Sequence, residues 1–457
     1  MKKALVSEAR KLLPTSVVHV LENTYRKNRA RTMAAYYGHP ARHLRVIGVT
    51  GTNGKTTTVN FLNEILKQAG YKTAMFSTAT IEIAGKSHRN DLNATVASTA
   101  EMQRFFRQAK RAKVNFVVME FPSHAIHQYK LYGVPVEMAI MTNLTQDHLD
   151  YHGTMEAYAA VKGRLFANRP KYIVLNHDDG WYDYYNKFEA SDQKITYGQL
   201  PEAEAHIDHI KLFRKGTEAT ITVDSQTKLE LATNLPGEFN VYNLAAAVSG
   251  AYLLGVKLDD IVEGIANLES VPGRFEYATA NQPYDVVVDY AHTPDGLEKI
   301  LTAAQKLSKN RVILVFGSCG DRDKGKRPQM GEIAARLADR IFLTDEESYN
   351  EDPKQIRQMI YEGIESVKGG PIKTTEVPDR RDAIEKALGV ATKGDMILIT
   401  GMGHEVYRIV NGQRIPWNDT QVVHDILAKT TADASNDNSG SASSAGQSFA
   451  KPGKPRA

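Results

Sequence analysis

Residues 46–58 read VIGVTGTNGKTTT, an apolar run that breaks into a glycine-containing loop and continues into a helical pattern. Loops of this kind place backbone N–H groups and the start of a helix against phosphate oxygens. Lys55 would reach the outer phosphates of a nucleotide, and the Thr56 hydroxyl would ligate Mg²⁺. The spacing departs from the general phosphate-binding pattern, because the first glycine, Gly51, stands only three residues before Gly54. The strand before the loop and the helix after it still predict a nucleoside triphosphate site rather than a turn that only begins a helix.

Length and composition limit the kind of protein. At 457 residues the chain is longer than one hydrophobic core usually serves, so two or three domains are expected. No segment has the roughly 18 uninterrupted apolar residues of a membrane span, and the N-terminal sequence lacks a secretory signal, which favours the cytoplasm. The single cysteine, Cys319, excludes a disulfide framework and a thiolate metal cluster. A net charge of +4 is too small and dispersed to indicate nucleic acid as a partner.

Alternating apolar and helical segments indicate the domain organisation. From residue 46 onward, strand-like runs such as FVVMEF alternate with helical patterns, which predicts a parallel sheet covered by helices on both faces. A strand-rich patch follows at 194–233, and after the turn VPGR a second, smaller doubly wound series begins. The sequence therefore predicts an α/β protein. Its expected parts are a basic helical N-terminal arm (1–44), a central ATP-binding domain with a P-loop-type sheet (45–273), a C-terminal Rossmann-like domain (274–430) and a disordered tail (431–457).

Polar residues directly after the strands are the first candidates for chemistry, because ligands of open α/β sheets bind at the carboxyl ends of the strands. Glu120 ends FVVMEF, Asn143 follows MAIMT, His148 lies in QDHLDYHG, and Lys162 is on the next helix. A carboxylate beside the glycine loop could hold Mg²⁺ together with Thr56, since Mg²⁺ prefers oxygen ligands. From the local pattern alone, each of these residues also fits an ordinary structural or surface role.

Eight longer motifs follow one another along the chain: TGTNGKTTT, TNLTQDHLDYHG, VKGRLF, GEFNVYN, VPGRFE, VVDYAHTPD, GSCGDRDKGKRPQMG and GMGHE. This order resembles that of the Mur ligases, and the motifs GDRDKGKRP and DYAHTPD resemble the UDP-N-acetylmuramyl-tripeptide synthetase (MurE-type) branch. The resemblance covers about residues 45–428. The wider superfamily includes folylpolyglutamate synthase and cyanophycin synthetase.

The resemblance implies an ATP-dependent ligase. The γ-phosphate of ATP passes to a substrate carboxylate, and an amino group then attacks the acyl phosphate to form an amide. The implied cofactors are ATP, two Mg²⁺ ions and a carbamylated lysine, and paired cations would stabilise the negative charge of the transition state. The residues implied to bind ATP are Gly51, Thr52, Asn53, Gly54, Lys55, Thr56, Thr57, Asn143, Asn240, Asn243, Arg274, Asp289 and His292.

The same resemblance assigns the metal ligands and the residues of the catalytic step. Lys162 falls at the lysine that is carbamylated in this family, which would turn an ammonium into an anionic carbamate. The implied metal ligands are Thr56, Glu120, His148 and Lys162. The implied catalytic residues are Lys55, Lys162, His148 and Glu120.

The C-terminal motifs would choose the incoming amino acid. Arg322 matches the arginine that binds the amino acid's carboxylate, a bidentate role suited to guanidinium, and Gly401 and Glu405 match positions at the far end of the side chain. Diaminopimelate-specific members carry D-N-P-R where this chain reads E-E-S-Y, so Glu347 replaces the asparagine and Tyr349 the arginine. The lost arginine and the added acid favour lysine, or another basic amino acid, over diaminopimelate.

The acceptor side departs further from the family. The E-V-S-S-H motif is EFPSH here and supplies Ser123 and His124, and the T-T-P motif begins at Thr95. Only 45 residues precede Val46, where family members usually have a uridine-nucleotide-binding domain. The basic arm could meet a different acceptor, an anionic membrane surface or a partner subunit, and a plain helical cap on the sheet explains it equally well.

Three functions compete. The leading one is a monomeric ligase of peptidoglycan synthesis that adds a basic amino acid to a muramyl-peptide-like acceptor. The second keeps the chemistry but extends another polymer, such as poly-γ-glutamate, a cyanophycin-like chain or folylpolyglutamate. The third is a nucleotide-binding scaffold without catalysis. The complete set of Lys55, Thr56, Glu120, His148 and Lys162 weighs against the scaffold.

Overall fold

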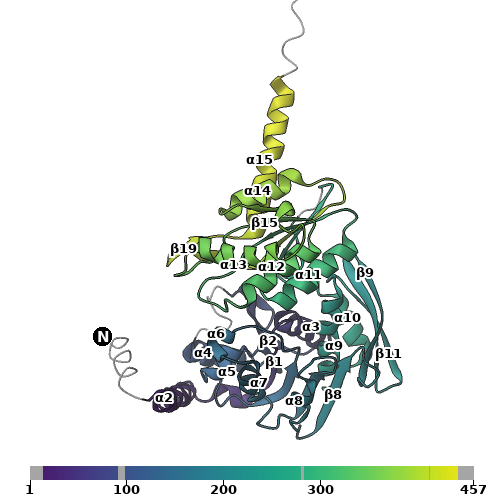
Figure 1. Cartoon of the computed structure of the whole chain (residues 1–457). Helices are drawn as coiled ribbons and strands as arrows, with labels where there is room; N and C mark the ends of the chain where they lie inside the picture. The colour runs from purple at the N-terminus through teal and green to yellow at the C-terminus, as the bar shows by residue number, and fades with distance from the viewer. Residues whose placement is uncertain (1–13, 91–97, 279–281, 411, 441–457) are drawn as a thin grey trace, which may run out of the picture.

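Two α/β domains are stacked on each other in the computed structural model, which describes residues 14–90, 98–278, 282–410 and 412–440 (Figure 1). The central domain lies below the C-terminal domain in this view. The N-terminal helix α2 lies at the outer edge of the central domain, and the last helix, α15, extends away from the C-terminal domain.

The central sheet has eleven strands within the described residues, in the order β11-β10-β9-β8-β7-β6-β1-β5-β2-β3-β4. Neighbouring strands from β2 to β9 pair in parallel, whereas β3–β4 and β10–β11 add antiparallel edges. The strands are β1 (Arg45–Thr50), β2 (Thr73–Phe76), β3 (Thr80–Ile83), β4 (Lys86–Arg89), β5 (Phe116–Glu120), β6 (Val136–Met141), β7 (Tyr172–Asn176), β8 (Gln193–Gly198), β9 (Ala205–Phe213), β10 (Gly216–Val223) and β11 (Thr227–Thr233).

Helices cover both faces of this sheet, as the alternating pattern predicts. The helices are α3 (Lys55–Gln68), α4 (Thr99–Arg111), α5 (Ser123–His127), α6 (Leu149–His152), α7 (Met155–Gly163), α8 (Tyr182–Asn186), α9 (Glu238–Leu253) and α10 (Leu258–Ala266). Successive residues of β1 point to opposite faces. Ile47 and Val49 pack in the core shared with α3, α9 and α10, and Val46 packs in the core shared with α4 and α7. Burial on both faces explains why β1 is almost continuously apolar.

The C-terminal domain is a smaller sheet in the order β12-β13-β17-β14-β15-β16, parallel except at β12. Its strands are β12 (Glu276–Tyr277), β13 (Asp285–Asp289), β14 (Val312–Phe316), β15 (Arg340–Leu343), β16 (Thr374–Glu376) and β17 (Met396–Thr400). Its helices are α11 (Pro294–Leu307), α12 (Lys326–Leu337), α13 (Pro353–Glu365), α14 (Arg380–Val390) and α15 (Asp419–Gly440). A hairpin of β18 (Tyr407–Val410) and β19 (Gln413–Pro416) follows the last strand of the sheet.

The first and last helices can be compared with the helical arm and the disordered tail that the sequence predicts. Helix α2 (Thr15–Tyr36) and a 3₁₀ turn, η1 (Pro40–His43), give the arm the helical character expected of it. Helix α15 continues to Gly440, into the stretch 431–457 for which the sequence predicts disorder, and 441–457 lie outside the described residues. Continuing a helix by one residue adds a hydrogen bond at small cost, so a polar composition alone does not end it. Within the described residues, no helix is long and apolar enough to cross a membrane.

Candidate functional site

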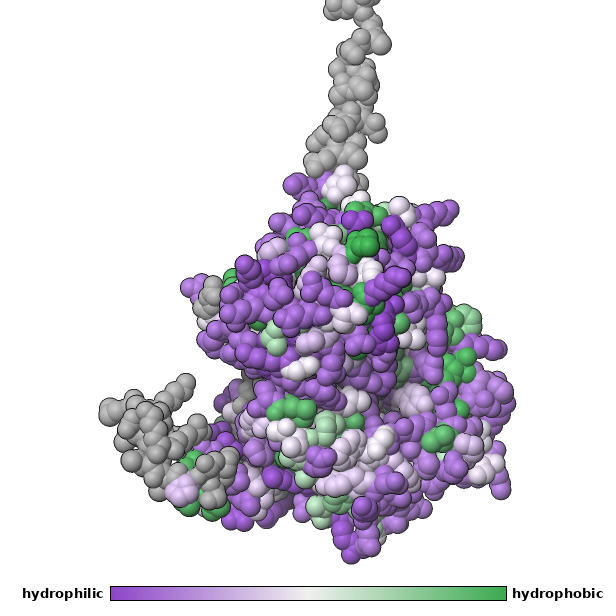
Figure 2. Space-filling model, in the orientation of Figure 1, coloured by the Kyte–Doolittle hydropathy of each residue, from purple (hydrophilic) through white to green (hydrophobic). Residues whose placement is uncertain are grey.

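A cavity of about 980 Å³ lies between the two domains, where the carboxyl ends of their parallel strands meet. Figure 2 shows the two domains in contact, one above the other, with mostly hydrophilic side chains on this face of both. The cavity is lined by the glycine loop, by the segments after β5 and β6, and by the segments after β13, β14, β15 and β17. Of the site residues predicted from the sequence, all those with described positions line it except Asn240.

The glycine loop is shaped by its two glycines and by Asn143. Gly51 and Gly54 have φ of +149° and +86°, and an added Cβ would lie 1.8 Å from the Thr142 hydroxyl oxygen and 2.1 Å from the Asn243 Oδ1, respectively. Both positions therefore require glycine. The Asn53 N–H donates to Asn143 Oδ1 at 2.9 Å, and Asn143 Nδ2 donates to the Asn53 carbonyl at 3.1 Å. Asn143 thus holds the loop from the end of β6.

Two lysines, the half-buried Lys55 and the buried Lys162, converge on the loop backbone. Lys55 Nζ donates to the carbonyls of Gly51 and Thr52 at 3.0 and 2.7 Å, and Lys162 Nζ donates to the Gly51 carbonyl at 2.6 Å. Burial, and then the charge of Lys55, hold the pKa of Lys162 well below its usual value. The surroundings of Lys162 therefore favour its neutral amine over the ammonium.

A buried carboxylate faces the start of α3. Glu120 is fully buried, and its oxygens accept hydrogen bonds from the Thr56 hydroxyl at 2.8 Å and from the N–H and hydroxyl of Thr78 at 2.6 and 2.9 Å. From the other domain, Arg274 Nη2 donates to the Thr56 hydroxyl at 3.0 Å. The Thr56 hydroxyl and Glu120 carboxylate are the hard oxygen ligands that Mg²⁺ prefers. No group of three His, Cys, Asp or Glu in the described ranges could hold a metal alone, so phosphate oxygens would have to complete the coordination.

Asp147 is a site residue that the sequence reasoning missed. It is 4% exposed, and its carboxylate lies 3.5 Å from Lys326 Nζ, 3.2 Å from His148 Nε2 and 3.8 Å from His292 Nε2. Burial opposes ionisation, but Lys326 and the histidines outweigh it and hold the pKa of Asp147 well below its usual value. Its position directly before His148, after the end of β6, was the signal that could have found it.

His148 has the protonation state of a metal ligand. Burial lowers its pKa well below the usual value, which favours the neutral imidazole. Its Nδ1 atom is buried and has no hydrogen-bond partner in the part of the chain that the structure describes. Neutral imidazole nitrogens are the form that binds metals, so this side chain fits the predicted role.

Of the residues predicted to contact adenine, only Asn243 lines the cavity. The predicted adenine contact of Asn240 stays a prediction; this side chain is 1% exposed, and its amide donates to the Pro236 carbonyl at 2.7 Å. Asn240 also accepts from Asn243 Nδ2 at 3.2 Å, so it supports its neighbour from behind.

The connection between the domains is made beside the loop. Asn53 Nδ2 donates to Asp295 Oδ2 at 2.7 Å, which ties the loop to the start of α11. Asp289, at the end of β13, accepts from the backbone N–H groups of Phe275 and Ala291, each at 2.7 Å. Asp289 therefore orders the segments that carry Arg274 and His292 to the cavity.

The amino-acid end of the cavity is built from three loops of the C-terminal domain. Arg322 follows β14, and its guanidinium carbon lies 5.1 Å from the centre of the Tyr349 ring. Glu347 follows β15, and its two oxygens accept from the Tyr349 hydroxyl at 2.9 Å and from the Ile409 N–H of the β18 hairpin at 3.0 Å. Gly401 and Glu405 follow β17 and also line the cavity.

Carboxylates concentrate at this end. Burial, and then the charge of Glu347, raise the pKa of Glu405 to about 7. Glu346 is 3% exposed, accepts from Cys319 Sγ at 2.8 Å, and keeps its Oε2 without a partner among the described residues. Three acids therefore line the same end of the cavity, where the charges of Glu347 and Glu346 disfavour the ionisation of Glu405.

The acceptor motif brings its two described residues to the cavity. Ser123 Oγ lies 3.0 Å from His152 Nε2, and the His124 ring lies 4.6 Å from the His148 ring and 4.2 Å from the Tyr151 ring. Burial, and then the charge of Arg322, lower the pKa of His124 to about 4. The predicted substrate contact of Thr95 lies outside the described residues.

Known protein families match both domains of the chain. The Mur ligase middle domain matches residues 49–251, and the Mur ligase glutamate ligase domain matches residues 273–403. The chain is 40% identical over 428 residues to the UDP-N-acetylmuramoyl-L-alanyl-D-glutamate--2,6-diaminopimelate ligase of Geobacillus kaustophilus, which covers 92% of this chain and 86% of that protein. It is 39% identical over 407 residues to the ligase of the same name from Clostridium botulinum, covering 88% of this chain and 82% of that one.

Solved structures agree with these matches. A UDP-N-acetylmuramoyl-L-alanyl-D-glutamate--2,6-diaminopimelate ligase aligns with a TM-score of 0.59 at 33% identity, covering 85% of this chain and 79% of that chain. Folylpolyglutamate synthase of Mycobacterium tuberculosis, complexed with ADP and AMPPCP, aligns with a TM-score of 0.67 at 17% identity and covers 82% and 92%, which shows a shared fold.

The fold and these relatives define the class as an ATP-dependent, ADP-forming ligase. The chain belongs to the Mur ligase family, in its MurE-type branch, whose members use ATP and Mg²⁺ in peptidoglycan synthesis.

Proposed function

We propose that this ligase joins lysine, or another basic amino acid, to the carboxyl group of a muramyl-peptide-like acceptor. The observation that supports this choice is the set of acids Glu346, Glu347 and Glu405 at the end of the cavity that also carries Arg322. The relatives are named for diaminopimelate, but this chain has Glu347 and Tyr349 where the diaminopimelate motif has asparagine and arginine.

The charges at the amino-acid end complement a substrate with one carboxylate and two amines. Arg322 would bind the α-carboxylate, since a guanidinium matches a carboxylate with two parallel hydrogen bonds. The side-chain ammonium would then lie near Glu347 and Glu405. Diaminopimelate would instead bring a second carboxylate among these acids, and unpaired like charges reject a competing ligand effectively.

The proposed reaction has two steps. An acceptor carboxylate oxygen attacks the γ-phosphorus of ATP, and the bond to ADP breaks to leave an acyl phosphate. The substrate's α-amine then attacks the carbonyl carbon, the bond to phosphate breaks, and the amine loses a proton as the amide forms. Lys55 and the N-terminal amides of α3 would hold the phosphate oxygens. Bound Mg²⁺ would neutralise the negative charge that gathers on them.

We further propose that Lys162 works as a carbamate. A neutral amine adds to CO₂ to form an anionic carbamate and releases one proton, and the lowered pKa of Lys162 favours that neutral form. The carbamate would face the ammonium of Lys55 and could hold the second of two Mg²⁺ ions with Glu120 and His148. Thr56 and Glu120 would hold the first. The unpartnered Nδ1 of His148 supports this assignment.

The test is a measurement of phosphate release, with product masses, over a matrix of amino acids and acceptors. The amino acids are lysine, ornithine, arginine, glutamate and meso-diaminopimelate. The acceptors are UDP-N-acetylmuramoyl-dipeptide, the same muramyl peptide without UDP, poly-γ-glutamate and a folate. We expect amide formation with lysine on a muramyl peptide, and none with the Lys55→Met control. Preference for diaminopimelate would refute the choice of amino acid, and activity only with another polymer would refute the acceptor.

The oligomeric state and the cellular location stay predictions. The enzyme is expected to be a monomer and to act in the cytoplasm, and sedimentation of the purified chain would test the oligomeric state. Whether the acceptor carries UDP is decided by the two muramyl acceptors in the same matrix.

A further inference from the structure

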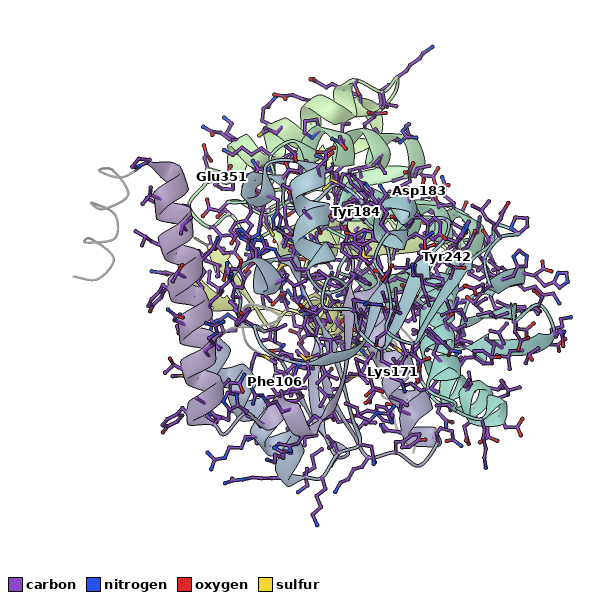
Figure 3. The ribbon with its side chains drawn as sticks, turned by 90° about the horizontal axis from the view of Figure 1, so that it is seen from below. Phe106, Lys171, Asp183, Tyr184, Tyr242 and Glu351 are labelled. Carbon is purple, nitrogen blue, oxygen red and sulfur yellow. The ribbon has the colours of Figure 1, made fainter. Side chains whose placement is uncertain are left out.

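Helix α2 exposes a stripe of apolar side chains. Its residues with large exposed apolar groups are Val17, Val20, Leu21, Tyr25 and Tyr36, with exposures of 42%, 64%, 56%, 65% and 76%. Val17, Val20, Leu21 and Tyr25 lie on one side of its first turns, and Tyr36 lies on the same side eleven residues further along, beyond the exposed Asn28 and Thr32. Figure 3 shows α2 along the outside of the molecule, with side chains that point away from the body. A stripe of this kind on a surface helix marks an interaction site.

The side of α2 that carries Ala30 is fixed to the central domain, because Ala30 is 1% exposed and the helix packs on α4. At the edge of this side, Lys27 Nζ lies 4.9 Å from the centre of the Tyr129 ring, and Arg31 Nη2 donates to the Tyr132 hydroxyl at 3.1 Å. Lys130, between these two tyrosines, lines the cavity. The helix is therefore a fixed surface feature next to the segment that follows the acceptor motif.

The surface around the stripe is strongly basic. Helices α2 and α4 together carry eight Lys and Arg against two Glu, a net charge of +6, whereas the whole chain has +4. The rest of the chain is thus slightly acidic, and the positive charge is concentrated on two adjoining helices. The exposed basic residues are Arg29, Arg31, Arg104, Arg107, Lys110 and Arg111.

We propose that α2 and α4 dock the enzyme on an anionic lipid surface. The apolar stripe would enter the boundary between headgroups and acyl chains, while the basic residues meet anionic headgroups. The combination selects a lipid surface over the alternatives. A nucleic acid backbone offers no apolar layer for Val20 and Leu21, and a second copy would bring two strongly positive helix pairs together.

Vesicle flotation of the full chain tests this. The probes are vesicles of phosphatidylglycerol and phosphatidylcholine in equal parts, and vesicles of phosphatidylcholine alone, at low and high salt. We expect binding to the first, at least tenfold weaker binding to the second, and loss of binding as salt screens the charges.

Three double variants separate the causes. V20D/L21D removes the apolar stripe, R104E/R111E reverses charge on α4, and K211E/K215E reverses two exposed lysines on the distant strand-rich edge as the matched control. The first two should each weaken binding tenfold or more, and the control should leave it unchanged. All should keep the thermal midpoint of the parent, so the result does not depend on ligase activity.

Other outcomes overturn the proposal. Unchanged flotation of V20D/L21D would mean that the surface binds polyanions by charge alone, and a titration with single-stranded RNA would then identify that class. A parent chain that sediments as a dimer, with V20D/L21D as a monomer, would make the stripe a contact between copies. Equal binding to both vesicle types would exclude headgroup recognition.

Discussion

The two ends of the cavity are built in different ways. The nucleotide end consists of backbone: a loop of consecutive residues with glycines at Gly51 and Gly54, held by the Asn143 amide. The amino-acid end consists of side chains on three separate loops, after β14, β15 and β17. A change of Gly51 or Gly54 displaces the chain itself, whereas a change at the second end exchanges one functional group for another.

This difference assigns the chemistry to one end and the choice of amino acid to the other. Glu120 and Lys162 of the nucleotide end are buried and tied to the loop and its helix. Among the described residues, Glu347 accepts hydrogen bonds from the Tyr349 hydroxyl and from one backbone N–H of the β18 hairpin. Substitutions at the nucleotide end should therefore slow turnover with every amino acid, and substitutions at the other end should change which amino acid is used.

Removal of Lys162 should give the largest effect. Lys162→Ala is expected to lower kcat by roughly a thousandfold or more with all amino acids, because it removes the proposed carbamate from the phosphate-transfer step. Formate or acetate added to the alanine variant should restore part of the activity by supplying an anion. Lys162→Arg, which keeps the charge but cannot form the carbamate, should stay inactive.

Phosphate release and the mass of the intact protein check this prediction. A mass increase of one bound CO₂, seen in the parent and not in either variant, would accompany the loss. An alanine variant with full kcat would show that the carbamate has no part in turnover.

Arg322→Ala comes next and belongs to the other end. The loss of a hydrogen-bonded charge is worth roughly 2 kcal/mol, so we expect kcat/KM for the amino acid to fall by about thirtyfold. The KM for ATP should change little, because Arg322 lies in the loop after β14, among the amino-acid residues. Steady-state kinetics with each substrate varied in turn would check this, and an equal loss in both would place Arg322 in the nucleotide site.

The same contrast explains what could be predicted from the sequence. The glycine loop is contiguous, so its strand, turn and helix could be predicted from a few adjacent residues. Helix α11 spans Pro294–Leu307, and its start has a local signal, because Thr293 caps it by accepting from the Gly296 N–H and Pro294 suits its first turn. Local signals of this kind are present in the chain before it folds.

Contacts between distant segments could not be predicted in this way. Asp147 meets Lys326 from the other domain, and no local pattern pairs two residues so far apart. Asn240 and Asn243 are three residues apart, yet Asn243 lines the cavity, whereas Asn240 is buried and accepts a hydrogen bond from Asn243. What each side chain contacts depends on the residues packed around α9, which a local pattern does not specify. The set of three carboxylates at the amino-acid end likewise forms only when separate loops come together in the fold.

Exchange of the specificity loop should have a smaller effect, and a selective one. The double variant Glu347→Asn with Tyr349→Arg restores the two side chains of the diaminopimelate motif. It should shift the ratio of kcat/KM for diaminopimelate and lysine by about tenfold or more toward diaminopimelate, because a desolvated carboxylate partner is worth roughly 1 to 3 kcal/mol. Competition between the two amino acids measures the ratio directly. Tyr349→Phe is the control, since it removes only the hydroxyl that holds Glu347. An unchanged ratio would mean that this loop does not choose the amino acid.

The smallest expected effect is a pH dependence confined to the amino-acid end. The pKa of Glu405 is raised to about 7 by burial and by Glu347, so this carboxyl is charged above pH 7 and neutral below it. Lysine keeps its side-chain charge throughout this range. Its attraction to Glu405 is therefore present at pH 8 and mostly lost at pH 6, and kcat/KM for lysine should fall about fivefold over that interval, as a free-enzyme titration. Bound lysine favours the charged carboxylate, so kcat at saturation should change less.

The variant Glu405→Gln cannot titrate at this position. Its kcat/KM for lysine should be low at both pH values, and the change in kcat/KM near pH 7 should be absent. Kinetics of the two proteins in matched buffers would decide the point. A step of the same size in the glutamine variant would assign the titration to another group, and the proposed contact between Glu405 and the substrate's ammonium would then be wrong.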